Sequence, residues 1–135
     1  MSLISNKGNY GLQAMLILAS HQDKELLQIK EISIKGNIPK NYLEQILVSL
    51  KKESLVESTR GANGGYKLAK SSKDIQVHEI LDTLESCFSN KTTASNALDS
   101  FWEDSNEKIK NVFALSLKDL EEYVNLNNSS QMYYI

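Results

Sequence analysis

The chain has 135 residues, 41% of them hydrophobic, which suits a single domain with a buried core. Its only cysteine, Cys87, excludes an intrachain disulfide, and since no membrane span or secretory leader is evident we expect a cytoplasmic protein with no membrane partner. The net charge of −2 is unevenly distributed. Residues 1–70 carry +4, from ten Lys and Arg and six Asp and Glu, and residues 71–135 carry −6, from five Lys and Arg and eleven Asp and Glu.

The first predicted element is a helix from about Ser5, a suitable N-cap, to about His21. Gly8 and Gly11 lie inside this helix, although each costs about 1 kcal/mol against Ala in a helix interior. We therefore expect another helix to pack closely against these two positions. The apolar positions of this first helix are Tyr10, Met15, Leu16 and Leu18.

A short second helix and a turn follow. Leu26 and Leu27 predict an extended entry or a short strand, and a helix is expected near residues 30–35. Gly36 suits the left-handed position that ends a helix, so residues 36–39 form the predicted turn. Pro39, the only proline, fits at or just before the first turn of the next helix, where its missing N–H is not needed.

The third predicted helix, residues 40–53, has the sharpest pattern in the chain. Its leucines and isoleucines recur at i, i+3, i+4 and i+7 and make one apolar stripe. The members of this stripe are Leu43, Ile46, Leu47 and Leu50. The other face carries Lys40, Asn41, Glu44, Gln45 and Lys52.

A β-hairpin is predicted directly after the third helix. Two short runs, residues 56–60 and 66–69, flank a stretch that holds three of the six glycines and the only arginine, Arg60. Asn63-Gly64 favours the left-handed conformations of a tight hairpin turn. Helix, turn, helix and hairpin in this order predict a winged helix-turn-helix, in a mainly α fold with a small β-hairpin.

This arrangement predicts a protein that binds double-stranded DNA. Gln45 can bond bidentately to adenine, Glu44 can accept from cytosine N4, and Arg60 can reach phosphate or the minor groove. The basic first half of the chain suits phosphates, although a solvated helix face and a chance distribution of charge remain the alternatives. The predicted DNA-binding residues are Lys40, Asn41, Tyr42, Glu44, Gln45, Arg60, Gly61, Asn63 and Gly64.

Two further helices are predicted in the second half. Val77, Ile80, Leu81 and Leu84 mark a fourth helix. Phe101-Trp102 opens a long amphipathic helix, after which Ser116 and Asp119 resemble a capping box. The tail from residue 125 to residue 135 can either pack on a dimer or fray.

The long helix must bury its apolar stripe somewhere, so we expect contacts between two copies of the chain rather than intrachain core contacts. The predicted dimer residues are Trp102, Ile109, Val112 and Phe113.

Residues 5–12 (SNKGNYGL), 42–47 (YLEQIL) and 55–68, which include the run RGANGGY, resemble the Rrf2 family of bacterial repressors of the IscR, NsrR and CymR type. The resemblance runs from about residue 3 to residue 124. It implies a homodimer that binds an operator with near two-fold symmetry and that dimerises through the long helix. It also divides the chain into a winged helix-turn-helix over residues 1–86, a loop over 87–100 that holds a cluster in relatives, and the dimerisation helix with the tail over 101–135.

The loop departs from the family pattern. Many relatives hold an iron–sulfur cluster through three closely spaced cysteines, whereas residues 87–100 contain only Cys87. A cluster needs several thiolates or close substitutes, so we predict no cluster and no other cofactor. The similarity is then to the branch without the cysteine triad, which responds to a partner protein or a small effector. The loop is either a sensing segment or a plain linker.

Cys87 itself is open to several interpretations. It can be a small buried hydrophobe at a helix end, or a redox-sensing thiol with a lowered pKa and solvent access. A disulfide between subunits or a weak metal site also stays open. Lys91 is the only nearby support for a reactive thiol.

An enzyme is not expected. The chain shows no metal pair and no nucleophile beside a base, and the glycine-rich run lacks the Lys-Ser/Thr ending of a phosphate-binding loop and precedes a strand. The second class of function is a protein-interaction adaptor that has lost DNA binding. Binding to DNA that depends on salt concentration, Arg60 and Gln45 separates a repressor from an adaptor.

Overall fold

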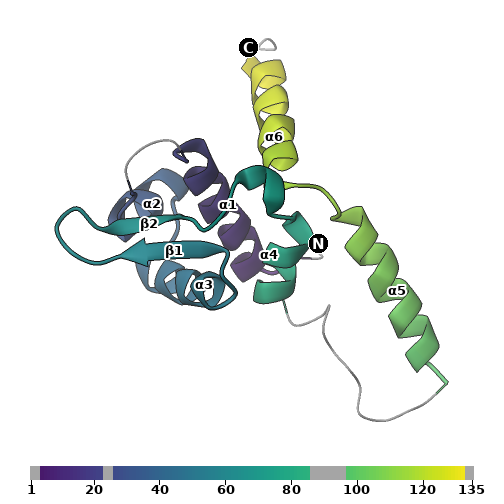
Figure 1. Cartoon of the computed structure of the whole chain (residues 1–135). Helices are drawn as coiled ribbons and strands as arrows, with labels where there is room; N and C mark the ends of the chain where they lie inside the picture. The colour runs from purple at the N-terminus through teal and green to yellow at the C-terminus, as the bar shows by residue number, and fades with distance from the viewer. Residues whose placement is uncertain (1–3, 23–25, 86–96, 133–135) are drawn as a thin grey trace.

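The computed structural model describes residues 4–22, 26–85 and 97–132 (Figure 1). Six α-helices, a short 3-10 helix and one β-hairpin follow one another along the described residues. Their order is α1 (Asn6–Ser20), α2 (Ile29–Gly36), α3 (Lys40–Lys52), β1 (Val56–Thr59), β2 (Gly65–Leu68), η1 (Ser72–Asp74), α4 (Val77–Leu84), α5 (Asp99–Val112) and α6 (Leu117–Met132). No helix among these residues is both long and apolar enough to cross a lipid bilayer.

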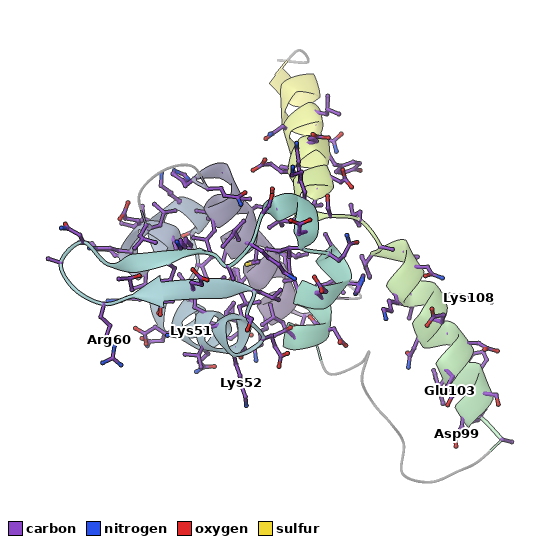
Figure 2. All side chains as sticks on the ribbon, in the orientation of Figure 1. Lys51, Lys52, Arg60, Asp99, Glu103 and Lys108 are labelled. Atoms are coloured by element: carbon purple, nitrogen blue, oxygen red, sulfur yellow. The ribbon has the colours of Figure 1, made fainter. Side chains whose placement is uncertain are left out.

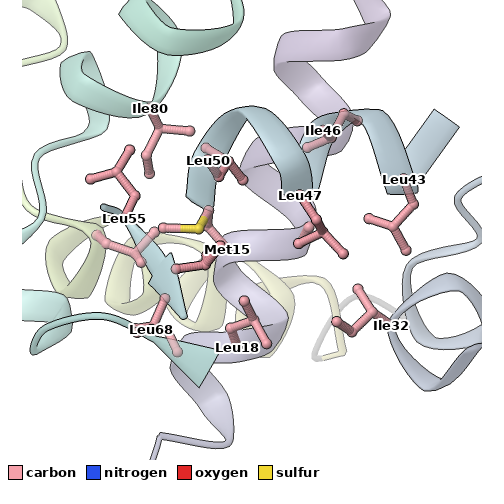
Figure 3. Close-up of a cluster of buried hydrophobic side chains, with 14 of the residues drawn as sticks. Met15, Leu18, Ile32, Leu43, Ile46, Leu47, Leu50, Leu55, Leu68 and Ile80 are labelled. Carbon is pink, nitrogen blue, oxygen red and sulfur yellow. The ribbon is translucent and has the colours of Figure 1, made fainter. Parts of the chain in front are cut away.

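Helix α1 is the centre of the fold. It packs against α2, α3, α4, β2 and α6, so this one helix contacts most of the other elements. The core surrounds Met15, which is fully buried, and draws on α1, α2, α3, both strands and α4 (Figure 3). Buried side chains of this core include Ile32, Leu43, Ile46, Leu47, Leu50, Leu55, Leu68 and Ile80.

The two glycines of α1 lie where α4 ends, as the sequence predicted. A Cβ atom on Gly11 would collide with the Leu84 side chain, and one on Gly8 would collide with the carboxylate of Glu85. That carboxylate accepts hydrogen bonds from the Ser5 amide at 2.8 Å and the Ser5 hydroxyl at 2.6 Å. Ser5 is also the N-cap of α1, accepting from the Gly8 amide, so the end of α4 and the start of α1 are joined through one carboxylate.

The predicted left-handed position at the end of the second helix is one residue off. Gly36 is the last residue of α2, and Asn37 takes the left-handed conformation with φ 50° and ψ 48°. Asparagine tolerates this region better than other residues with a side chain. Gly36 itself lies in a crowded position, because an added Cβ would lie 2.8 Å from the Ile38 side chain and 3.0 Å from that of Ile17.

The hairpin turn also differs from the prediction. β1 and β2 are antiparallel, with Val56 opposite Leu68 and Thr59 opposite Gly65, so five residues connect them instead of a two-residue Asn-Gly turn. Neither Asn63 nor Gly64 has a positive φ; the left-handed residue of the loop is Gly61, at φ 113°. The longer loop is closed by the Gly64 amide, which donates to the Gly61 carbonyl at 3.0 Å.

The long C-terminal helix is interrupted. Helix α5 ends at Val112 and α6 begins at Leu117, because the connecting residues pair with the segment before α4. The Val77 amide donates to the Leu115 carbonyl and the Leu117 amide to the Ile75 carbonyl, both at 2.8 Å. The predicted capping box at the start of α6 is confirmed, since Ser116 and Asp119 exchange hydrogen bonds at 3.0 and 3.3 Å. Helix α6 extends to Met132, so most of the predicted tail is helical.

Replacement of Leu47 by alanine is expected to lower the free energy of unfolding by about 2–5 kcal/mol, because Leu47 is fully buried and its removal leaves a cavity. The neighbouring Val48→Ala is the matched control, since Val48 is exposed and its loss should change stability by less than about 0.5 kcal/mol. Urea unfolding followed by circular dichroism measures both. Equal effects of the two variants would contradict the packing of α3 described above.

Candidate nucleic-acid interface

Helix α3 presents a polar stripe directly opposite its buried one. At about 100° per residue, the positions facing away from the apolar stripe lie on one line along the helix. They are Asn41, Gln45, Val48 and Lys52, and all four are exposed. Lys40 and Glu44, also exposed, lie on the flank of this line. Five of the predicted DNA-binding residues are on α3, and the structure exposes all of them except Tyr42.

Tyr42 faces the interior side of α3 and is half-buried. Its ring meets that of Tyr10 edge to face, with centroids 5.6 Å apart and an interplanar angle of 76°. This contact links α1 to the first turn of α3. Tyr42 therefore lies beside the polar stripe, and its contact with DNA stays a prediction.

The hairpin loop, residues 60–64, is the predicted wing tip. Arg60, Gly61, Ala62 and Asn63 are all exposed, whereas Gly64 is buried. A Cβ on Gly64 would collide with the Thr59 carbonyl, so this glycine lets the loop fold back on its own strand. The exposed part of the tip is therefore small and presents Arg60 as its charged group.

The wing is fastened to the start of α2. Leu27 and Tyr66 form an antiparallel bridge in which each amide donates to the other residue's carbonyl, at 3.1 and 2.7 Å. Gly65 permits this pairing, because it has φ 154° and an added Cβ would lie only 2.5 Å from the Leu27 carbonyl oxygen. Gln28, the N-cap of α2, also donates from Nε2 to the Ala62 carbonyl at 3.3 Å.

Lysine side chains near the junction of α3 and the hairpin complete the surface. Lys51 Nζ donates to Ser58 Oγ at 2.6 Å, which connects the last turn of α3 to β1. Figure 2 shows Arg60 on the hairpin loop and Lys52 on α3 projecting toward the same side of the molecule. Lys51 was not among the predicted site residues. Its seven-residue spacing from Glu44, which places it on the flank of the polar stripe, was the signal available in the sequence.

A second exposed surface lies on α5, which extends away from the core in Figure 1. None of its residues is buried, and Phe101, Trp102 and Val112 are 58%, 51% and 72% exposed. Together with Ile109 they occupy an arc of about 100° on the helix, the width of an ordinary packing face. Of the other predicted dimer residues, Ile109 and Phe113 are half-buried.

A helix-turn-helix followed by a β-hairpin wing defines the winged-helix class of nucleic-acid-binding proteins. The family profile described as Rrf2, an iron-dependent transcriptional regulator, matches residues 4–126. The chain belongs to the Rrf2 family.

Several curated relatives are similar over much of the chain. The HTH-type transcriptional regulator CymR of Bacillus subtilis is 32% identical over 136 residues, which cover 98% of this chain and 99% of the relative. The HTH-type transcriptional regulator IscR of Cereibacter sphaeroides is 38% identical over 96 residues, 70% of this chain. The matched part spans only 62% of that IscR and 49% of a further regulator from Azotobacter vinelandii. These relatives are transcriptional regulators and not enzymes.

Solved structures of the family have the same fold. IscR of T. potens superposes with a TM-score of 0.75 at 35% identity, covering 91% of this chain and 88% of that one. CymR (YrzC), the global cysteine regulator of B. subtilis, also gives 0.75, at 33% identity, covering 91% and 98%. The predicted winged helix-turn-helix fold is thereby confirmed.

The iron dependence in the family's description is not matched by the ligands that this chain offers. Iron–sulfur clusters are held by several cysteine thiolates, and the whole sequence contains one cysteine. Within the described ranges, no three His, Cys, Asp or Glu side chains come together as a metal site. Cys87 lies outside the described residues. The donor set does not fit a cluster of the three-cysteine type.

Proposed function

We propose that the chain is a homodimeric transcriptional repressor of the cytoplasm that binds a near-palindromic operator. In this proposal the winged helix-turn-helix spans residues 1–86 and α3 enters the major groove. Arg60 and the wing contact the adjacent backbone or minor groove. The observation that carries the proposal is the outward stripe of α3, whose hydrogen-bonding residues Asn41 and Gln45 project on the face opposite the core.

The positive charge of this surface suits the phosphate backbone of DNA. Three cations lie around the junction of α3 and the wing: Lys51, Lys52 and Arg60. When such side chains contact DNA, they release the counterions condensed on its phosphates. Lys67, on the neighbouring strand, is instead 3.7 Å from Glu57, so part of its charge is already balanced. The affinity for DNA should therefore depend on salt and on the cations at this junction.

Arg60→Ala is expected to weaken binding to the operator about tenfold or more and to lower the salt slope by about two, because each protomer of the dimer loses one cation from the interface. Gln45→Ala is expected to relax specificity at one base pair per half-site, a loss of about 1–3 kcal/mol. Binding titrations at several salt concentrations, on an operator selected from random-sequence DNA, measure both effects.

Lys118→Ala is the matched control, because it removes one exposed positive charge from α6, away from the wing. Its affinity and salt slope should equal those of the unaltered protein. If Arg60→Ala and Lys118→Ala weaken binding equally, the wing is not a contact surface. If the unaltered protein selects no sequence at all, the proposal fails, and a tightly bound protein partner would then support an adaptor.

Helix α5 supports the homodimer. Exposure of the apolar residues Trp102 and Val112 to water is unfavourable. Two copies of α5 bury these residues when their apolar faces pack together. A dimer also matches the two-fold symmetry of a palindromic operator, because each protomer then supplies one α3 to each half-site. Residues 101–112 would thus set the spacing between the two DNA-reading surfaces.

Val112→Asp is expected to convert the dimer to a monomer, because it places a charge within the apolar face, at its most exposed residue. Asn111→Asp introduces the same side chain one residue earlier, on the polar face, and should leave the dimer intact. Size-exclusion chromatography with light scattering gives the mass of each variant. A monomeric unaltered protein, or equal behaviour of the two variants, would contradict the proposed interface.

We further propose that regulation is free of an iron–sulfur cluster and depends on a partner protein or a small effector. The single cysteine of the sequence supports this, since one thiolate cannot replace three. Protein purified without oxygen should show no visible absorption band of a cluster and far less than one iron per chain. A brown protein with stoichiometric iron and sulfide would overturn this part of the proposal.

A further inference from the structure

One residue on the outward stripe of α3 has no hydrogen-bonding group. Val48 is 66% exposed, and it lies between Gln45 and Lys52 on the line that faces away from the core. Single exposed apolar residues are common and need no explanation in general. Val48 differs from them because every other member of its stripe is a hydrogen-bonding or charged residue of the kind that contacts DNA.

The position of Val48 along the helix is within reach of a base pair next to the one that Gln45 faces. Three residues advance a helix by about 4.5 Å, close to the roughly 3.4 Å step between neighbouring base pairs. Lys52 follows about 6 Å further along and suits the phosphate backbone. Along the stripe, Val48 therefore stands between a base-reading amide and a phosphate-binding ammonium.

The major groove presents one apolar group, the 5-methyl group of thymine. A valine cannot distinguish bases by hydrogen bonds, but it buries a methyl group that adenine, guanine and cytosine do not offer at that position. We propose that Val48 is a specificity-determining residue that reads a thymine methyl group in each half-site. This inference rests on the proposed function, because it requires α3 to lie in the major groove.

The test removes the methyl group and nothing else. Each thymine of the selected operator is replaced in turn by deoxyuridine, which keeps every hydrogen-bonding group of the base. One such replacement in a single half-site is expected to weaken binding of the unaltered protein about threefold to fivefold, the effect of one methyl group lost from a contact. Thymines outside the two half-sites serve as control positions and should show no effect.

Val48→Ala makes the test specific to this side chain. The variant should bind the thymine and deoxyuridine operators equally at the sensitive position, while Lys118→Ala should keep the full discrimination. Because Val48 is exposed, its replacement leaves the fold intact, and circular dichroism verifies this.

Two results overturn the inference while leaving DNA binding in place. Either no deoxyuridine within the half-sites weakens binding, or the discrimination survives unchanged in Val48→Ala. Failure of the protein to select any operator is a different result, and it removes the proposed function together with this inference.

Discussion

The buried stripe of α3 is the contact on which the rest of the molecule depends. Leu43, Ile46, Leu47 and Leu50 are each fully buried. Because one side of a helix is fixed by this packing, the opposite side has no freedom to rotate. The direction in which Asn41, Gln45 and Val48 project is therefore determined by leucines and isoleucines that do not themselves reach the surface. The edge contact between Tyr10 and Tyr42 fixes the same helix at its first turn.

The wing depends on a second constraint, the pairing of its inner strand with the segment before α2. A two-stranded hairpin alone is only marginally stable in water. The bridge between Leu27 and Tyr66 gives β2 a backbone partner on its other edge, and Gln28 holds the tip through the Ala62 carbonyl. The loop that carries Arg60 is consequently tied to the start of α2, although Arg60 lies 33 residues after Leu27 in the chain.

Periodicity in the sequence was sufficient to predict the core helices, since the stripes of α3 and α4 are clean and α1 has a recognisable cap at Ser5. The errors arose where the outcome depends on contacts distant in sequence. Gly36 favours a left-handed helix end, but Asn37 takes that conformation, and Gly36 lies where the side chains of Ile17 and Ile38 leave little room. Asn63-Gly64 favours a two-residue turn, but the strand pairing ends at Thr59 and Gly65, so five residues form the loop. The start of α6 was marked in the sequence by the Ser116–Asp119 capping box. The pairing of residues 115–117 with residues 75–77 and the hydrogen bond from Lys51 to Ser58 join segments distant in sequence or in different elements, so they could not be predicted from the helix patterns alone.

The hydrogen bond from Lys51 to Ser58 has an entropic consequence. A lysine side chain that moves freely in water loses up to about 2 kcal/mol of rotamer freedom when it is fixed against a ligand. Lys51 is already restricted by a serine hydroxyl 2.6 Å from its ammonium group, on a strand that is itself held in place. Folding has thus already removed part of the rotamer freedom that the Lys51 side chain would otherwise lose when an anion binds. Lys51 therefore loses less side-chain entropy on binding an anion than a lysine whose side chain moves freely.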